Sequence, residues 1–408
     1  MSENAQKPCI RFKGFSDAWE QRKFDELYEK VSEKNDLTYG TDEIISVANM
    51  YFKPDSFVTD IEYLRTYNVF HLGDIAFEGN KSKNFAHGRF VENTIGDGIV
   101  SHVFDVFRPK TKYDLLFWKY AINNERLMGG ILVRSTKAST MMTNLVANDF
   151  LRETILVPSL EEQKQIGAIL GNVDTLITLH QRKYDKLVAV KKSLLEKMFP
   201  ADGETVPKIR FKGFSDAWEQ RKLSELTSMH ARIGWQNLRT SEFLNNGEYM
   251  LITGTDFDDG AINYSTCHYV DRERYEQDKN IQIRNGSILI TKDGTLGKVA
   301  YVQGLSMPAT LNAGVFNVQI KASNLVDEKY LFQYLKAPYL MDYVGKKATG
   351  GTIKHLNQNI LVDFPIFMPK KSEQIMIGAY YQLLDNLITL HQRIKIFITG
   401  DYHDKKNK

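Results

Sequence analysis

The stretch IRFKGFSDAWEQRK occupies residues 10–23, and the same fourteen letters recur at residues 209–222. A second repeat closes each half of the chain, with LITLHQR at 176–182 and again at 387–393. Just before it, VPSLEEQKQIGAIL parallels MPKKSEQIMIGAYY through matched Pro, Glu, Gln, Ile, Gly and Ala. A spacing near two hundred residues is far longer than a solenoid unit of about 20–50 residues. The repeats therefore predict duplication of a whole domain together with a connector.

The composition sets only broad limits. A chain of 408 residues with a 42% hydrophobic share is long enough for two or three globular domains. The 53 basic and 50 acidic side chains give a net charge of +3. This balance permits a nucleic-acid partner, but any phosphate-binding surface must be local.

The cysteines and the start of the chain suggest an ordinary intracellular protein. Cys9 and Cys267 cannot form a disulfide framework, and His268 beside Cys267 has no further ligand at metal-binding spacing. We therefore expect both cysteines to be structural and no metal site. The first residues lack a signal sequence and no run of about eighteen apolar residues occurs, so we expect a cytoplasmic location.

Each half contains short segments typical of strands around one expected helix. EIISVANMYF, SHVFDVFRP, GSILIT, KVAYV and VFNVQI are rich in β-branched and aromatic residues and are bounded by turn formers. The helix is expected to start at the N-cap residue Asp114 in one half and Asp327 in the other.

A long helix follows Pro158, with Ser159 and Glu162 in capping-box positions, and a second begins near Ser372. Apolar residues at alternating spacings of four and three predict a coiled-coil seam with two polar members, His180 and Lys191. The interface between the two helices is expected to comprise Ile166, Leu170, Val173, Ile177, His180, Tyr184, Leu187, Leu194, Leu384, Leu387, Leu390, His391, Ile394 and Phe397.

The predicted fold class is α+β, with two pseudo-symmetric mixed α/β domains separated by two long antiparallel coiled-coil helices. The expected boundaries are 1–157 for the first domain, 158–200 for the central helix, 201–369 for the second domain, and 370–408 for the C-terminal helix and tail.

Two divergent globes, two near-identical helical connectors and the run P-xxx-EQ-xx-IGA before each helix resemble the DNA specificity subunit of type I restriction-modification systems. The resemblance covers essentially the whole chain. It implies a non-catalytic subunit in which each variable region is a target recognition domain that reads one half of a split double-stranded DNA site, while the helices set the spacer.

The resemblance also implies partners and cofactors. Modification subunits, two of them, would methylate adenine with S-adenosylmethionine, and restriction subunits would use ATP and Mg²⁺. This chain itself would bind no cofactor. The residues agree, since the sequence contains no Asn-Pro-Pro-Tyr-type methylation motif, no GxxxxGK[ST] loop and no nuclease carboxylate site.

Candidate DNA contacts are donors that lie beside aromatic residues in expected loops, because phosphates and base edges both require donors. In the first half they are Lys81, Lys83, Asn84, His87, Arg89, Arg134, Lys137, Thr140 and Asn144. In the second half they are Arg232, Trp235, Arg239, Lys292, Lys298, Lys346, Lys347, Lys354 and His355.

Three features have alternative interpretations. Lys292 and Lys298 flank the DGTLG turn and fit a solvated hairpin equally well. His180 and His391 hold equivalent places in the repeats; a metal pair or pH switch is conceivable, but packing between the helices is favoured, and we expect the two rings to lie close together. Stacking of Trp19 and Trp218 on bases is one alternative, yet their identical surroundings favour packing against the helices or docking of a shared partner.

Two other classes of function remain open. A freestanding enzyme acting on nucleic acid would need cofactor motifs that the sequence lacks. A duplicated DNA-binding scaffold or regulator would bind a split site without any role in modification. In every case, the repeated block is predicted to belong to the frame, and the unlike regions between repeats to carry recognition.

Overall fold

Each half of the chain is closed by an antiparallel strand pair that joins the repeated block to the segment before the long helix. β1 (Glu20–Lys23) pairs with β12 (Thr154–Val157), and β13 (Glu219–Lys222) pairs with β24 (Pro365–Met368). In both pairs the first residue of the opening strand faces the last residue of the closing strand. The repeated block is therefore part of each domain and not a linker.

The computed structural model describes residues 8, 10–53, 60–138, 142–201, 203–234, 237–347 and 355–399. Cys9, Thr140, Trp235 and Lys354 lie outside these ranges. The chain forms two compact units, residues 1–178 and 179–408, and the boundary falls within helix α5 (Leu160–Lys197). Within the described ranges, no helix combines the length and apolar character needed to cross a bilayer.

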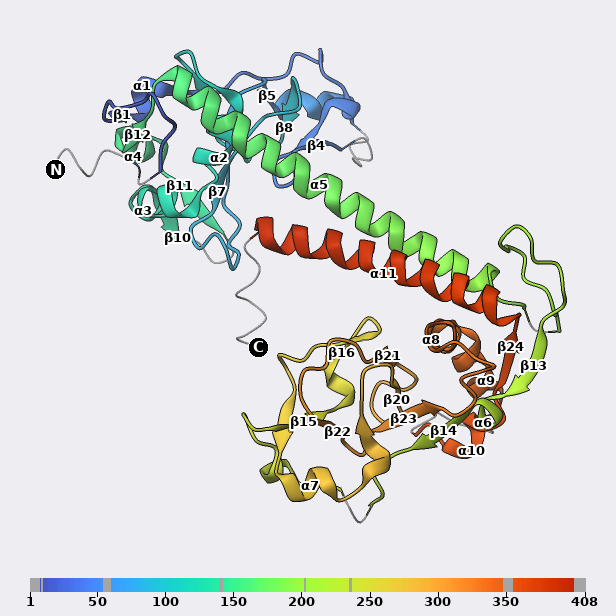
Figure 1. Ribbon diagram of the computed structural model, residues 1–408. Helices are drawn as coiled ribbons and strands as arrows, with labels where there is room; N and C mark the ends of the chain where they lie inside the picture. Colours follow the sequence, from blue (N-terminus) through green and yellow to red (C-terminus); the bar gives the residue numbers. More distant parts are fainter. Residues whose placement is uncertain are drawn as a thin grey trace. The chain divides into compact units, whose positions relative to one another are not determined.

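The first unit is built on an antiparallel four-stranded sheet in the order β2-β9-β6-β7 (Figure 1). Phe24, Phe90, Phe107 and Phe150 pack in its core, with ring centroids as close as 4.4 Å. The sheet strands are Tyr28–Val31, Val106–Pro109, Ile75–Glu78 and Arg89–Glu92. The smaller pairs are β3 (Ile45–Ser46) with β4 (Tyr51–Phe52), β5 (Asn68–Phe70) with β8 (Gly98–Val100), and β10 (Thr136–Ala138) with β11 (Thr143–Leu145). The helices are α1 (Phe24–Leu27), α2 (Leu115–Ala121), α3 (Glu125–Ser135), α4 (Ala147–Arg152) and the 3₁₀ turns Thr41–Glu43 and Ile61–Thr66.

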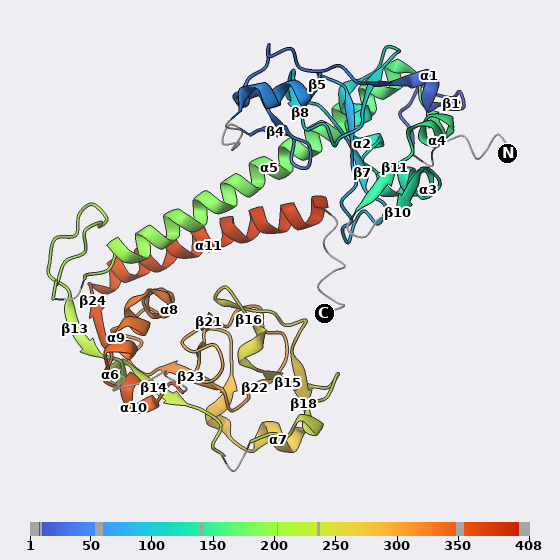
Figure 2. The same cartoon turned by 180° about the vertical axis from the view of Figure 1, so that it is seen from behind.

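The second unit repeats this sheet as β14-β23-β20-β21 and adds another, β18-β15-β22-β19 (Figure 2). The repeated sheet comprises Thr227–His230, Val315–Ile320, Ile288–Thr291 and Val299–Tyr301. The added sheet comprises His268–Val270, Tyr249–Ile252, Ala309–Leu311 and Gln282–Ile283, beside the hairpin β16 (Phe257–Asp258) and β17 (Ala261–Ile262). The helices are α6 (Leu223–Leu226), α7 (Arg272–Glu276), α8 (Glu328–Lys336), α9 (Tyr339–Lys347), α10 (Gln358–Leu361) and α11 (Lys371–Thr399), with 3₁₀ turns at Thr240–Glu242, Gly254–Asp256 and Lys279–Ile281.

The expected N-caps of the internal helices are confirmed. The Asp114 carboxylate accepts a hydrogen bond from Phe117 N, and the Asp327 carboxylate accepts from Lys329 N and Tyr330 N. The expectation of one helix per half is wrong, because α3 and α4 follow α2, and α9 and α10 follow α8. In the first half the reason is a second cap: Asn124 accepts from two backbone N–H groups and starts α3 directly after α2.

Only half of the predicted capping box at the start of α5 forms. The Ser159 hydroxyl accepts from Glu162 N at 3.3 Å. The Glu162 carboxylate instead accepts from Arg11 and Trp19 of the repeated block. Tertiary contacts thus replace the local cap.

On α5 the predicted seam positions are half-buried or buried, while most of their neighbours are exposed. The prediction that Ile166 belongs to the interface between the two long helices is wrong, because Ile166 packs against the core of the first unit. In the second unit, Leu187 and Leu194 pack against that unit's core. The residues Leu170, Val173 and Ile177 lie in the first unit, and their pairing with α11 remains a prediction.

Within the second unit, the end of α5 and the start of α11 run antiparallel and side by side in both views (Figures 1 and 2). His180 lies against His391, and Phe199 stacks on Tyr381 with ring centroids 6.0 Å apart. Lys191 contacts Asp385, whose other oxygen accepts from Gln333 of α8 at 2.8 Å. Burial lowers the pKa of Lys191, helped by the nearby Lys336.

The predicted interface is wrong at two residues of α11. Leu390 is 50% exposed and Phe397 is 83% exposed. The buried positions are Ile377, Tyr381, Leu384 and Ile388. Because α11 also packs against α8, its buried face is shifted from the predicted one, although Leu384 and His391 lie on both. His391 continues the buried stripe, and Leu390 points away from it.

At one equivalent buried position, the two related sheets carry different polar residues, Tyr301 and Glu92. Tyr301 of β21 faces Ile288, and its hydroxyl donates to Glu328. Glu92 of β7 faces Ile75 in the same way, yet it is 2% exposed and neither carboxyl oxygen has a hydrogen-bond partner among the described residues. Burial raises the pKa of Glu92 to about 9, and the charge of Asp114 adds to the effect. Glu92 thus stays protonated in the folded state at neutral pH.

Replacing Glu92 by Leu should stabilise the first unit by about 1–3 kcal/mol, since an unpaired buried polar group is removed. The folded-state pKa is raised, so the native state keeps a proton that the unfolded state releases above about pH 4.5. Wild-type stability should therefore fall between pH 5 and 9 more steeply than that of Glu92→Leu. Urea unfolding at pH 5 and 8 measures this, with Glu29→Leu on the exposed face of β2 as control. Equal pH dependence in wild type and Glu92→Leu would contradict it.

Candidate nucleic-acid interface

The repeated block is fastened to the first turn of the long helix by a buried ion pair. In the first unit, Arg11 Nε and Nη2 donate to the two carboxylate oxygens of Glu162, both at 2.7 Å. Trp19 Nε1 donates to the same carboxylate at 3.2 Å. The Glu162 side chain is 1% exposed. We refer to this contact, Arg11 with Glu162, as the first clamp.

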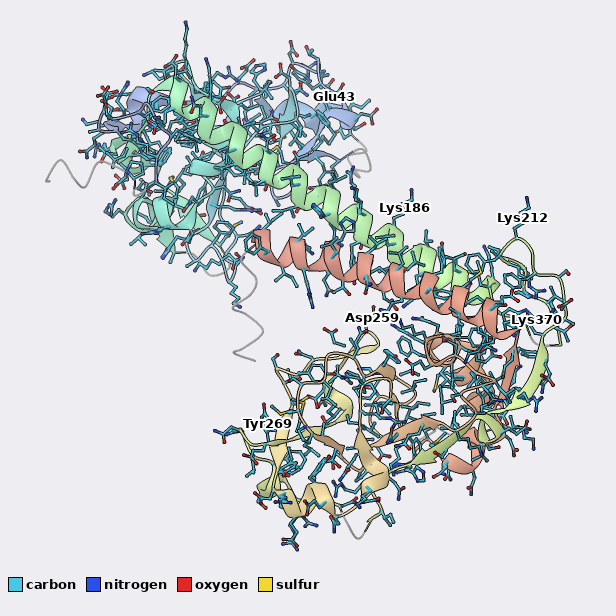
Figure 3. The ribbon with its side chains drawn as sticks, in the orientation of Figure 1. Glu43, Lys186, Lys212, Asp259, Tyr269 and Lys370 are labelled. Atoms are coloured by element: carbon cyan, nitrogen blue, oxygen red, sulfur yellow. The ribbon has the colours of Figure 1, made fainter. Side chains whose placement is uncertain are left out.

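The second unit forms the same contact, here called the second clamp. Arg210 donates to both oxygens of Glu373 at 2.7 and 2.8 Å, and the Glu373 side chain is fully buried. The guanidinium also lies 5.9 Å from the ring of Trp218, which is 3% exposed. Figure 3 places Lys212 of the repeated block and Lys370 at the same end of α11. Bidentate pairing in a buried setting fixes the block against the helix with one geometry.

The glutamine after each clamp glutamate holds the internal helix. Gln163 accepts from Asp114 N at 3.2 Å, and Gln374 accepts from Asp327 N at 2.9 Å. The glycine four positions later permits the close approach: a Cβ on Gly167 would lie 2.3 Å from Asp114 Oδ1. The EQ...IGA run thus joins the long helix to both the repeated block and the internal helix. The contacts of Trp19 with Glu162 and of Trp218 with the second clamp confirm the expectation that the two tryptophans pack against the helical frame.

In the first unit the structure brings together two candidate stretches whose contacting residues are 56 and 64 positions apart in sequence. The β6–β7 loop, residues 79–88, lies against the β10–β11 hairpin (Figure 1). Thr143 N donates to Gly79 O at 2.8 Å, and the single proton of its buried hydroxyl is shared between Gly79 O at 3.1 Å and His87 O at 3.0 Å. We call this combined surface the first-unit tip.

The candidate side chains of the first-unit tip differ in availability. Lys81, Lys83, Asn84, Lys137 and Asn144 are exposed, and His87 is half-buried. The two arginines are both ion-paired, although the Arg134 side chain is itself exposed. Arg89 donates to Glu78 and to Ala48 O, both at 2.7 Å, and Arg134 at the end of α3 donates to both oxygens of Glu153. The exposed lysines and asparagines are therefore the better DNA candidates here.

Three candidate stretches of the second unit line one hollow of about 450 Å³. Its wall includes Arg232, Lys292 and His355. Leu356 N donates to Lys292 O at 2.8 Å, and His355 Nδ1 lies 2.6 Å from Asp293 Oδ1. The β20–β21 loop is thus held by the segment after α9, much as the β6–β7 loop is held by the β10–β11 hairpin. We call this the second-unit hollow.

Arg232 is not the exposed donor that we expected. It is 2% exposed, and its guanidinium donates to Leu311 O at 3.0 Å and to Gln277 at 3.2 Å. Lys292 is half-buried, with its ammonium 5.6 Å from the ring of Phe316. Arg239, Lys298, Lys346, Lys347 and His355 are exposed, but of these five only His355 lines the hollow. No sequence pattern predicts the burial of Arg232, because its hydrogen-bond acceptors are mainly backbone and amide oxygens.

The clamp residues were missed as a functional pair, although a signal existed. Each repeated block carries one arginine ahead of its tryptophan, and each closing block carries a glutamate directly before its glutamine at the start of a helix. A cation and an anion duplicated together are candidates for mutual contact. Across the described ranges, no group of three or more His, Cys, Asp or Glu side chains is placed to hold a metal ion.

The second clamp should respond unequally to loss of its two partners. Arg210→Ala leaves Glu373 buried without its counter-ion and should cost about 3–5 kcal/mol of unfolding free energy. Glu373→Ala should cost less, because Arg210 lies near the surface and can turn to water. Lys212→Ala, in the same block but exposed, should change stability by no more than about 0.5 kcal/mol. Urea unfolding followed by tryptophan fluorescence measures all three, and equal losses for Arg210→Ala and Lys212→Ala would contradict the clamp.

Thr143→Val should loosen the first-unit tip while leaving the fold intact. The change removes the hydrogen bond that the buried hydroxyl shares between Gly79 O and His87 O, at a cost of about 1 kcal/mol. Hydrogen exchange should quicken in residues 79–88 and in the β10–β11 hairpin. Thr136→Val is the matched control, since its hydroxyl bonds only to Leu132 O of α3. Unchanged exchange in residues 79–88 would show that the hydroxyl does not hold the tip.

Comparison with known proteins points to one family. The model of the type I restriction modification DNA specificity domain matches residues 16–189 and again 215–399. The chain is 25% identical over 307 residues to the type I restriction enzyme MjaVIII specificity subunit of Methanocaldococcus jannaschii, covering 73% of this chain and 70% of the relative. The putative MjaX specificity subunit of the same organism is 22% identical, with 83% and 74% covered.

Solved structures share the fold. The S subunit of a type I restriction-modification system from M. genitalium aligns with a TM-score of 0.53 at 15% identity, covering 95% of this chain and 94% of that one. A chain from a study of complex assembly and conformational transition of the type I system aligns with a TM-score of 0.52 at 17% identity, with 96% of each chain covered. With both halves matched by the same family model, the chain belongs to the type I restriction modification DNA specificity family.

Proposed function

We propose that this chain is the non-catalytic specificity subunit of a type I restriction-modification complex, in which each variable region reads one half of a split DNA site. The observation that carries the proposal is the pairing of one repeated frame with two unlike surfaces. The clamps, the EQ...IGA contacts and the closing strand pairs are the same in both halves. The loops that they support differ in sequence, in length and in their polar side chains.

The chemistry of the two surfaces suits this division of labour. The first-unit tip offers lysines for phosphates and two asparagines, Asn84 and Asn144, whose amide groups can pair bidentately with adenine. The second unit offers the half-buried Lys292 and the exposed His355 in the wall of the hollow, and further exposed cations outside it. A protein that reads two different half-sites needs this kind of difference between its halves.

The same proposal assigns catalysis to partners. Two modification subunits would bind S-adenosylmethionine and methylate adenine, and restriction subunits would use ATP and Mg²⁺. The frame repeated in both halves gives two equivalent modification subunits two equivalent docking places. Residues 1–157 and 201–369 would form the recognition domains, and 158–200 and 370–408 the connectors that set the spacer.

Exchange of one variable region should change one half of the methylated motif. A chimera that replaces residues 24–153 by the matching region of another family member, with junctions at the repeated strand pair, should fold, because both clamp residues are retained. Methylation mapping in cells with the modification partner should show a new first half-site, an unchanged second half-site and an unchanged spacer. The wild-type gene and a gene deletion are the controls.

The outcomes separate the competing functions. Loss of all methylation at the motif on gene deletion supports the proposal. DNA binding at a split site with no change in methylation would identify a regulator or scaffold instead. Methyl transfer or cleavage by the purified chain alone would identify a freestanding enzyme.

A further inference from the structure

Two imidazoles meet edge to edge between the long helices of the second unit. His180 Nδ1 of α5 and His391 Nδ1 of α11 are 2.8 Å apart, with ring centroids separated by 5.0 Å and ring planes at 45°. Both side chains are half-buried. Two nitrogens of the same kind at this distance share one proton, since one must donate and the other must accept. One of the two Nδ1 atoms therefore carries a lone pair and the other an exchangeable proton.

The helices hold these rings in place from one side. Leu384 and Ile388 are buried on the turns of α11 before His391, and Lys191 is paired with Asp385 about three turns of α5 beyond His180. The repeated sequence LITLHQR supplies both histidines, one from each copy. Two ligands on two packed helices lose little conformational freedom when they bind a third group.

The spacing fits a metal ion with a small adjustment. Late first-row divalent ions bind imidazole nitrogen at about 2.0–2.1 Å, which places two ligands of a tetrahedral ion about 3.3 Å apart. The nitrogens need to separate by about 0.5 Å, which is within the reach of small χ rotations. On binding, the ring that carries its hydrogen on Nδ1 loses that proton to solvent and takes one up on Nε2, so both rings stay neutral and both Nδ1 lone pairs go to the metal.

We propose that His180 and His391 form a two-histidine site for a late first-row divalent cation, of the zinc, cobalt, nickel and copper class, that ties α5 to α11 in the second unit. Water completes the coordination, because the described ranges contain no third His, Cys, Asp or Glu in position. Imidazole ligands select these ions over Mg²⁺ and Ca²⁺, which prefer oxygen. The site revises the expectation from sequence that the chain holds no metal, and it is independent of DNA binding.

Metal titration of the purified full-length chain tests the proposal. Co²⁺ followed by visible absorption, and Ni²⁺ followed by calorimetry, should each show one saturable site that is absent from His180→Asn and from His391→Asn. The exposed His102 lies in the first unit, so His102→Asn is the matched control and should keep the site. At Zn²⁺ tenfold above its dissociation constant, the melting temperature of the second unit should rise by about 3–6 °C in the wild type and in His102→Asn. It should not rise in the two site variants or with Mg²⁺.

Two results would overturn the site: no saturable binding by the wild type, or equal binding by the wild type and both site variants. If either variant fails to fold, as judged by its helical circular dichroism, the wild type alone decides. Electron paramagnetic resonance of the chain with one equivalent of Cu²⁺ should then show two nitrogen donors. A spectrum with a single nitrogen donor would count against the site.

Discussion

The buried carboxylate at the first turn of each long helix is the contact on which the rest of the structure depends. Glu162 and Glu373 each receive a bidentate guanidinium, and the next residue holds the N-terminus of the internal helix. Desolvating such a pair is expensive, and leaving either partner alone is worse. The pair therefore does more to fix one arrangement than to add stability. The clamp arginine and glutamate are buried only when the repeated block, the long helix and the internal helix are all packed together.

This constraint explains why the halves are alike at their edges and unlike between them. The clamp, the closing strand pair and the central four-stranded sheet recur, while the second unit adds a further four-stranded sheet and the first unit carries smaller pairs in its place. Loops supported by such a frame can change without disturbing it, because their anchor points are backbone hydrogen bonds. The bonds from Thr143 N to Gly79 O and from Leu356 N to Lys292 O do not depend on the side chains of the loops.

Much of the frame was predictable because its signals are local or repeated. The N-caps Asp114 and Asp327, the strand at 315–320 and the seam along α5 all follow from short-range patterns. The errors arise where tertiary packing decides. The face of α11 is set by α8 as well as by α5, which exposes Leu390 and Phe397, and Arg232 is buried against backbone oxygens that no motif marks. The composite first-unit tip joins segments whose proximity depends on the path of α3, a helix that the sequence pattern did not reveal.

The polar groups between α5 and α11 in the second unit set their register. An apolar seam tolerates a slip by one heptad, because one leucine replaces another. Here a slip would bury Lys191 away from Asp385 and separate His180 from His391, leaving charged and polar groups unpaired. The alignment of the helices, and with it any spacing that they set, therefore rests on these few polar pairs.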